Sequence, residues 1–352
     1  MLAILIDYII PIVYNSFITL ILVLAVLFIF RIKDSGIRIL FFFLPLIKPF
    51  LVVAESINPH PGFSTDKVIN SGIRLPDPSN LFTFSGQYDE GPDIFVTGID
   101  YLYIMIIGFS ILLILIIRWF NLYLLYKRLA YEDKMTRKEI PIVYRIIDSF
   151  SRKLSIRPPD VSLTHRRYCS PFVVGIRYCT IVIYPNILEV LEREEKEVIL
   201  HHELSHIKRK DNLIGWIAMV IRDFMFFNPF AYMAYYLIRA EQDSGSDKLM
   251  VSHSPRPARE LAKNILNAVK KLGEMGGPAP LPGAVSGFVN AAGCFFAHFR
   301  LKNRVRSIMR NGDKRIRMRL FPRIMMYILF IFILLIQVMV VIDAGQFYIY
   351  LR

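Results

Sequence analysis

The sequence predicts an α+β membrane protein, in which four transmembrane helices carry a mostly helical cytoplasmic domain with a small β-sheet. The 352-residue chain combines a positive mean hydropathy with a formal net charge of +14, which is common in membrane proteins and rare in soluble enzymes. Four apolar stretches qualify as candidate spans. Three short strand-like segments, bounded by turn-forming residues, stand together in the middle of the chain.

The candidate spans cover about residues 9–30, 39–54, 101–117 and 324–342. The second is the weakest because Pro45, Lys48 and Pro49 interrupt it. A lysine at that depth needs a partner, a water-lined cavity or a kinked helix. The first span lacks the basic start and the small-residue cleavage site of a signal peptide.

Lysine and arginine residues near the span ends predict the orientation. The link after the first span and the flanks of the third and fourth are basic, whereas the outer loop 55–98 is acidic on balance. We expect a multi-pass protein of the cell (inner, cytoplasmic) membrane with both termini outside. The predicted units are a membrane domain at 1–127, a cytoplasmic domain at 128–322, and a fourth span with a short outer tail at 323–352.

The charge has a simple interpretation, because the basic residues gather beside the spans, where anionic lipid headgroups attract them. Nucleic-acid binding is the competing interpretation, but the chain carries no recognisable nucleic-acid-binding motif, so we expect no direct nucleic-acid partner. Cys169, Cys179 and Cys294 all fall in the predicted cytoplasmic domain, which favours free thiols over disulfides. The outer loop is either a sensor surface or a long connection.

The cytoplasmic domain shows helical spacing of apolar residues over 140–154 and 258–272. The predicted strands are 161–164, 172–176 and 180–184. Their sheet either pairs with an extended substrate at an edge strand or only supports the helix that follows.

Three further stretches leave alternatives open. Residues 213–237 are apolar but interrupted by charges and a proline, which favours two shorter helices over a span, with a re-entrant hairpin as the alternative. The Gly/Pro/Ala-rich stretch 276–293 is a flexible linker or a flap. Residues 300–323 carry ten basic residues and one acidic residue, which favours a helix on the membrane surface over a protease-sensitive segment.

An HExxH motif runs from His202 to His206. The charge-dense run 192–197 leads into it without a helix breaker. On a helix, the i, i+4 spacing places both histidines on one face, where they can bind one zinc ion. Glu203 lies beside them and can take a proton from a water at the metal, as a general base does. The motif is short enough to arise by chance, but its helical context favours a metal site.

A catalytic zinc ion usually takes three protein ligands. Asp243 and Glu241 are the candidates for the third. On a helix Asp243 and Asp247 share a face, so one carboxylate can bind the metal while the other orients a motif histidine. The candidates for holding an oxyanion are His253, Arg256 and Tyr236.

Together these motifs resemble the BlaR and MecR type of membrane-embedded zinc metallopeptidase, the antibiotic-sensing signal transducers. More distantly the chain is similar to the HtpX and CAAX prenyl-protease group. The resemblance is carried by residues 170–175, 180–185, 202–211 and 239–247. It implies a gluzincin-like protease domain, a Zn²⁺ cofactor bound by His202, His206 and Asp243, and supporting roles for Asp211 and Asp247. The family has glutamate at the position of Asp243, so this shorter side chain is a departure from the pattern.

The resemblance implies an endopeptidase that cleaves a cytoplasmic protein in signal transduction, such as a transcriptional repressor, or itself. Because no penicillin-binding sensor domain follows the fourth span, it implies the protease but not the β-lactam signal. Two alternatives stay open. One is an HtpX-like protease for membrane protein quality control. The other is a metal-free, catalytically inactive signalling scaffold, which Asp243 leaves possible because the family has glutamate at that position. We expect membrane lipids as partners, and the sequence leaves oligomerisation open.

Overall fold

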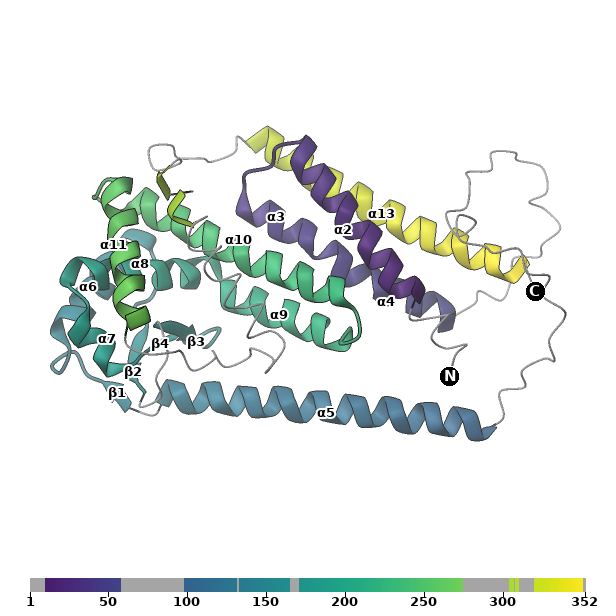
Figure 1. Cartoon of the computed structure of the whole chain (residues 1–352), viewed down its shortest axis with the longest axis horizontal. Helices are drawn as coiled ribbons and strands as arrows, with labels where there is room; N and C mark the ends of the chain where they lie inside the picture. The colour runs from purple at the N-terminus through teal and green to yellow at the C-terminus, as the bar shows by residue number, and fades with distance from the viewer. Residues whose placement is uncertain are drawn as a thin grey trace.

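The computed structural model describes residues 10–57, 98–131, 133–164, 171–274, 304–306, 308–309 and 320–350. These residues are mostly helical, with a small mixed sheet at one end of the molecule (Figure 1). Most of the predicted outer loop, the stretch 276–293, Cys169 and Cys294 lie outside the described residues. Cys179 is described and is a free thiol.

Three of the predicted spans lie within single helices. α2 (Ile10–Ile29) covers the first, α5 (Gly98–Tyr131) extends well beyond the third, and α13 (Leu320–Tyr350) covers the fourth. α2 begins and α13 ends on the side of the molecule away from the sheet (Figure 1). The expectation that both termini lie on the outer side of the membrane stays a prediction.

The second predicted span is not one continuous helix. It is divided at Phe43 into α3 (Ser35–Phe42) and α4 (Leu44–Ile57). Pro45 accounts for the break, because proline has no N–H to donate to the preceding turn and its ring clashes with the carbonyl four residues earlier. Lys48, the costly residue of this stretch, is buried within α4.

Among the described residues, two helices contain windows long and apolar enough to cross a membrane. These are Ile12–Ile29 of α2 and Gly108–Leu129 of α5. The apolar stretch Phe321–Ile336 of α13 is shorter. The count of four spans and the orientation therefore stay predictions.

The four-stranded sheet contains the three predicted strands and one more. Its strands are β1 (Asp133–Met135), β2 (Asp160–Leu163), β3 (Phe172–Val174) and β4 (Thr180–Ile183), in the order β1-β2-β4-β3. The central strands β2 and β4 are parallel, and β1 and β3 pair antiparallel at the edges. The prediction missed β1, which is short and has no alternation of apolar residues.

A hydrophobic core joins the sheet to the helices beside it. These helices are α6 (Pro141–Leu154), α7 (Pro185–Val190), α8 (Arg193–Arg209) and α11 (Ala258–Glu274). Phe150 of α6, Ile181 of β4 and Leu204 of α8 are fully buried in this core. The predicted helices 140–154 and 258–272 are thereby confirmed, and α8, which carries the HExxH motif, is fixed on the sheet.

A second core lies among the apolar helices. The stretch 213–237 forms α9 (Asp211–Phe224) and the start of α10 (Pro229–His253), which pack with α2, α3, α4 and α13. Asn228, between the two helices, donates a buried hydrogen bond to the Ser16 hydroxyl of α2 at 2.7 Å. Helices on both sides of the predicted boundary at residue 128 thus share one core.

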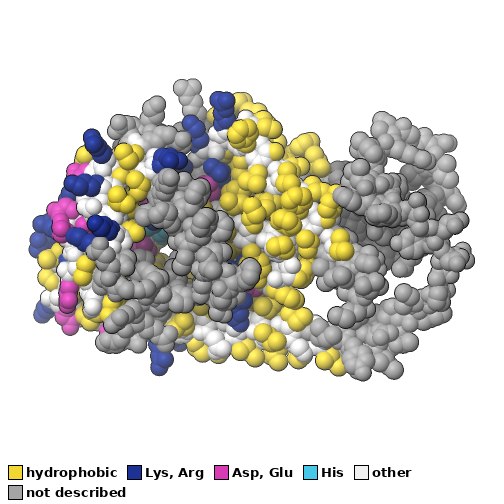
Figure 2. All heavy atoms as spheres, in the orientation of Figure 1, with side chains coloured by type: hydrophobic (Ala, Val, Ile, Leu, Met, Phe, Trp, Pro, Cys, Tyr) yellow, Lys and Arg dark blue, Asp and Glu magenta, His cyan; other side chains and the backbone are white. Residues whose placement is uncertain are grey.

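The surface agrees with this division into two cores. On the face shown in Figure 2, apolar side chains gather over the helices away from the sheet, and charged side chains gather over the sheet and its helices. The molecule therefore has an apolar end and a polar end, with α10 running from one towards the other (Figure 1).

The Arg222-Asp223 pair interrupts the apolar pattern of α9 and is buried. The Arg222 guanidinium donates to the Asp223 carboxylate at 2.6 Å and lies over the ring of Tyr235, 4.3 Å from its centroid. Asp223 also accepts a hydrogen bond from the Trp119 indole of α5 at 3.0 Å. The charges are therefore paired, as buried charges must be, and they attach α5 to α9.

Candidate metal centre

α8 is closed at both ends by local interactions. At its start the Glu192 backbone N–H donates to the Glu195 carboxylate at 2.9 Å, as in a capping box. At its end Lys210 has a left-handed backbone, with φ of 57°, so the chain turns at once into α9. The motif lies in the second half of α8, and the turn at Lys210 brings the start of α9 back towards it.

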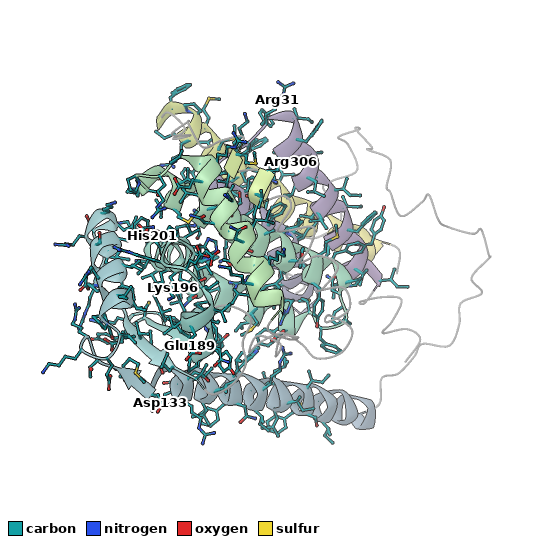
Figure 3. All side chains as sticks on the ribbon, turned by 60° about the vertical axis from the view of Figure 1, so that its left-hand side comes forward. Arg31, Asp133, Glu189, Lys196, His201 and Arg306 are labelled. Atoms are coloured by element: carbon teal, nitrogen blue, oxygen red, sulfur yellow. The ribbon has the colours of Figure 1, made fainter. Side chains whose placement is uncertain are left out.

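His201, just before the motif, and His202, its first residue, have different surroundings. His201, labelled in Figure 3, stacks on the ring of Phe150 with centroids 3.8 Å apart. Burial lowers the pKa of His201 to about 3, and the charges of Lys153 and Arg256 act in the same direction. His201 is therefore a neutral core residue, while His202 faces α10.

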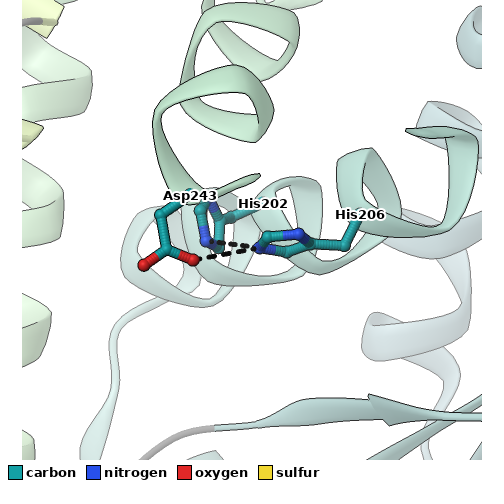
Figure 4. A group of neighbouring side chains, drawn as sticks. All are labelled: His202, His206 and Asp243. Atoms are coloured by element: carbon teal, nitrogen blue, oxygen red, sulfur yellow. Dashed lines mark hydrogen bonds and ion pairs between the residues drawn. The ribbon is translucent and has the colours of Figure 1, made fainter. Parts of the chain in front are cut away.

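His202, His206 and Asp243 bring three ligand atoms together within 4.8 Å of one another (Figure 4). The two Nε2 atoms are 3.1 Å apart, and Asp243 Oδ1 is 3.8 Å from His206 Nε2. Two imidazole nitrogens and one carboxylate oxygen are a donor set that zinc takes in catalytic sites. The residues present therefore fit a zinc ion.

His206 is oriented by residues around the turn from α8 to α9. Its Nδ1 lies 2.8 Å from Asp211 Oδ2 and 3.0 Å from the Ser246 hydroxyl of α10. Burial alone would lower the pKa of His206, but the hydrogen bond with Asp211 and the charge of Glu203 outweigh it and raise that pKa. With Nδ1 held in this way, Nε2 faces the other two ligand atoms.

His202 is oriented by a residue of α10 and by a residue much further along the chain. Its Nδ1 lies 2.9 Å from Asp247 Oδ1, and Arg304 donates to both oxygens of Asp247 at 2.8 Å. Arg304 Nη2 is also 3.2 Å from each ring nitrogen of His202. Although burial acts to raise the pKa of Asp247, the charges of Arg304 and His202 hold it well below its usual range.

Glu203 follows His202 directly on α8 and is partly buried. Burial raises the pKa of Glu203, and the charges of His206, His202 and Arg304 only partly offset that effect. A carboxylate with a raised pKa is a better base near neutral pH than an ordinary glutamate. This is the environment that a general base requires.

Of the stretch 300–323, expected to lie on the membrane surface, the structure describes residues 304–306, 308–309 and 320–323, and the first two segments pack beside the metal site instead. The apolar side chains of Val305 and Ile308 pack into a small core with Val198 of α8 and residues of α10 and α11. Arg304 points instead at Asp247 and His202. The buried carboxylate of Asp247 pairs with Arg304, so this part of the basic stretch 300–323 packs on the metal site.

The two candidates for the third ligand face different partners. Asp243 joins the ligand atoms of the two histidines, whereas Glu241 forms an ion pair with Arg38 of α3 at 3.0 Å. They lie two residues apart on α10, so they project from different sides of it. The close packing of α10 on α8 allows the shorter aspartate to reach the histidines.

The oxyanion candidates are spread along and beyond α10. His253 is exposed at its end and contacts Ser252. Arg256 forms ion pairs with Glu197 and with Glu194 and Glu260, away from the ligand atoms. Tyr236 lies two helical turns before Asp243 and therefore on the same side of α10. Tyr236 is therefore the candidate that shares a side of α10 with Asp243, and the assignment of the oxyanion donor stays a prediction.

β3 is an edge strand of the sheet and lies beside α8. The Asn212 amide, directly after Asp211, donates to the carbonyls of Val173 and Gly175 at 3.1 and 2.9 Å. Part of the outer edge of β3 is thus held by α9. The sequence did not indicate roles for Asn212, Ser246 or Arg304, because each becomes recognisable only through a contact with another element.

An HExxH helix whose histidines meet a carboxylate of a second helix, beside a small sheet and long apolar helices, defines a membrane metallopeptidase. The family model described as BlaR1 peptidase M56 matches residues 93–283. This match covers more than half of the chain, which therefore belongs to the BlaR1 peptidase M56 family.

The chain is also similar to proteins named Protease HtpX homolog. The one from Salinibacter ruber is 26% identical over 167 residues, which cover 42% of this chain and 60% of that protein. The one from Pyrococcus furiosus is 28% identical over 130 residues, covering 33% of this chain and 42% of that protein. The one from Halobacterium salinarum is 32% identical over 80 residues, covering 22% and 28%. The chain thus matches less than two thirds of the length of each.

These comparisons confirm the resemblance that the motifs predict. The chain belongs to the family of BlaR and MecR type peptidases and is similar to HtpX proteases.

Proposed function

We propose that this chain is a zinc-dependent, membrane-embedded endopeptidase that cleaves a cytoplasmic protein, with a transcriptional repressor as the first candidate, or itself. The observation that carries the proposal is the meeting of His202 Nε2, His206 Nε2 and an Asp243 oxygen within 4.8 Å. Each histidine also has its Nδ1 beside a carboxylate, which sets the ring orientation that metal binding needs.

A bound zinc ion would supply a Lewis acid for the scissile carbonyl and an increase in the acidity of a water molecule. His202, His206 and Asp243 would hold it. Asp247 and Asp211 fix the two rings, so that little reorganisation accompanies binding.

Glu203 has the role of general base in this proposal. It takes a proton from the attacking water, whose oxygen bonds to the carbonyl carbon of the substrate. As the peptide C–N bond breaks, the same carboxyl group gives the proton to the departing amine. Tyr236 is the residue we favour for donating a hydrogen bond to the carbonyl oxygen.

The polar end of the molecule would lie in the cytoplasm and the apolar end in the bilayer. The basic flanks of the predicted spans support this orientation. The apolar surface in Figure 2 supports the placement of the helices away from the sheet inside the bilayer. The metal centre then lies where α8 and α10 meet, next to the membrane, with access to proteins on the cytoplasmic side.

The test compares the full-length wild type with Glu203→Gln in detergent or in proteoliposomes. We expect one equivalent of zinc in both, and cleavage of a casein substrate that falls by about 10²- to 10⁴-fold in the variant, the usual contribution of a general base. Glu194→Gln, the same change earlier on α8, is the matched control and should cleave at the wild-type rate. Equal rates in wild type and Glu203→Gln, or a wild type that binds no zinc, would overturn the proposal.

The similarity to proteins named Protease HtpX homolog favours a second candidate, a general protease for misfolded membrane proteins. The two functions differ in substrate range. Incubation with a winged-helix repressor and with unfolded membrane proteins separates them: cleavage of the repressor at one site supports signalling, and degradation of many unfolded proteins supports quality control. A wild type that binds no zinc and cleaves neither would favour the scaffold.

A further inference from the structure

Arg209, in the last turn of α8, joins two regions that are far apart in the sequence. Its Nε donates to Asp211 Oδ2 at 3.1 Å, the same oxygen that lies 2.8 Å from His206 Nδ1. Its Nη1 donates to the hydroxyl of Ser35, the first residue of α3, also at 3.1 Å. Its side chain is only 19% exposed. One guanidinium thus contacts both the support of a metal ligand and the α2–α3 link, which comprises residues 30–35 and ends with the first residue of α3.

Gly245 of α10 makes room for this guanidinium. A Cβ atom at position 245 would lie well under 3.0 Å from the guanidinium atoms of Arg209, so the arginine could not keep its place. Glycine inside a helix costs about 1 kcal/mol relative to alanine, so its presence in the middle of α10 needs a reason. Contact with the guanidinium supplies one, because no other residue leaves this space.

The far end of the contact is itself held firmly. Asp34, just before Ser35, accepts hydrogen bonds from the Gly36 backbone at 2.9 Å and from Arg323 of α13 at 2.9 Å. On the next turn of α3, Arg38 pairs with Glu241 of α10 at 3.0 Å. The hydroxyl that Arg209 reaches therefore belongs to a link fixed on both α10 and α13.

We propose that Arg209, seated on Gly245, is a positioning residue: it fixes Asp211 and through it the His206 ring, and it connects the α2–α3 link to the metal centre. This inference rests on the proposed function, since it concerns the affinity of the same site for zinc. Arg209 touches neither the ligand atoms nor a substrate in this role, and it acts through Asp211. A shift of the α2–α3 link relative to α10 would then change the orientation of a metal ligand.

The experiment uses four full-length variants and two measurements that do not depend on activity. Gly245→Ala displaces the guanidinium, Arg209→Ala removes it, and the double variant does both. Gly108→Ala on α5 is the matched control, because a Cβ there meets nothing within 4 Å. The measurements are the zinc dissociation constant, by competition with a chromophoric chelator, and the visible absorption spectrum of the cobalt(II)-loaded protein. Thermal unfolding of the metal-free proteins tests for folding.

Gly245→Ala and Arg209→Ala should each weaken zinc binding by about tenfold, the lower end of the effect of residues that orient metal ligands, and should alter the cobalt spectrum alike. The double variant should be no weaker than Arg209→Ala alone, because the added methyl group then occupies the vacated space. Gly108→Ala should match the wild type.

Additive effects in the double variant would overturn the inference, and so would wild-type affinity in Arg209→Ala. If Gly245→Ala fails to fold, Arg209→Ala and its spectrum still decide the outcome. If the wild type binds zinc and both single variants bind it as tightly as the wild type does, this inference is refuted and the proposed function is not. If the wild type binds no zinc, the proposed function itself is refuted.

Discussion

His202 and His206 lie one turn apart on the same helix, yet they are held by very different parts of the molecule. The partners of His206 include Asp211, which lies five residues further along the chain, and Ser246 of α10. The partners of His202 are Asp247 of α10 and Arg304, which lies beyond α11 and 102 residues from His202. One ligand is thus oriented partly by local chain geometry and the other entirely by tertiary packing.

The surroundings of His202 and of His206 also differ in charge. On the His202 side, Asp247 and Arg304 form a two-point ion pair in which the aspartate side chain is 3% exposed. On the His206 side, the Asp211 oxygen is shared among an imidazole, a hydroxyl and one arginine nitrogen. Breaking a buried ion pair leaves a charge without its partner, so we expect the His202 side to be the more sensitive one.

Asp247→Asn should have the largest effect. The amide keeps the size of the side chain but removes the charge that faces Arg304 and His202. We expect the metal-free protein to lose about 3–5 kcal/mol of unfolding free energy, the usual cost of breaking a buried ion pair, and zinc affinity to fall by about 100-fold. Denaturant unfolding and chelator competition measure the two quantities.

The control for this change is Asp160→Asn at the start of β2, where the carboxylate pairs with Lys134 and is 60% exposed. Exposed pairs contribute little, so this variant should match the wild type in both measurements. If Asp247→Asn behaves like Asp160→Asn, the ion pair with Arg304 does not support His202.

Asp211→Asn should have an intermediate effect. His206 keeps the Ser246 hydroxyl at 3.0 Å. Arg209 loses its carboxylate partner but keeps the Ser35 hydroxyl, and its side chain is 19% exposed, so water can solvate part of the freed charge. We expect zinc affinity to fall by about tenfold and unfolding free energy by about 2 kcal/mol, as for hydrogen bonds to a charged group. A loss of stability as large as that of Asp247→Asn would remove the contrast between the two histidines.

Ser246→Ala should have the smallest effect. It removes the hydroxyl that donates to Asp211 at 3.1 Å and lies 3.0 Å from His206 Nδ1, and it leaves the ion pairs intact. The loss should be about 1 kcal/mol in unfolding free energy, with a change in zinc affinity of only a few fold. Ser252→Ala, an exposed serine of the same helix, serves as the control, and the comparison fails if Ser246→Ala weakens zinc binding more than Asp211→Asn.

The contrast between the two histidines also explains what the sequence could predict of the site. His202 and His206 share a face of one helix because of their spacing alone, and the structure brings them together. The choice of Asp243 over Glu241 needed the resemblance to a known family, since nothing local connects either residue to α8. Arg304 could not be predicted, because its partner is a carboxylate of another helix and its own segment shows only a basic pattern.

In the fold, too, local patterns were predictable from the sequence and tertiary contacts were not. Helices with a regular apolar pattern, such as α6 and α11, are where the sequence predicts them. β1 has three residues and is stabilised by pairing with β2, which no local pattern reports. The sharing of a core between α9, α10 and the apolar helices was also missed, because hydropathy shows that a helix is apolar but not which helices it packs against.

The Asn228–Ser16 hydrogen bond has a practical consequence for preparing this protein. A fragment limited to residues 128–322 would contain every candidate ligand, but it would lack α2 and with it the Ser16 hydroxyl that satisfies Asn228. It would also expose Ala231, Ala234 and Ile238, which are fully buried in the intact chain. The excised fragment should therefore aggregate in water, so biochemical work on this protein calls for the whole chain in detergent or lipid.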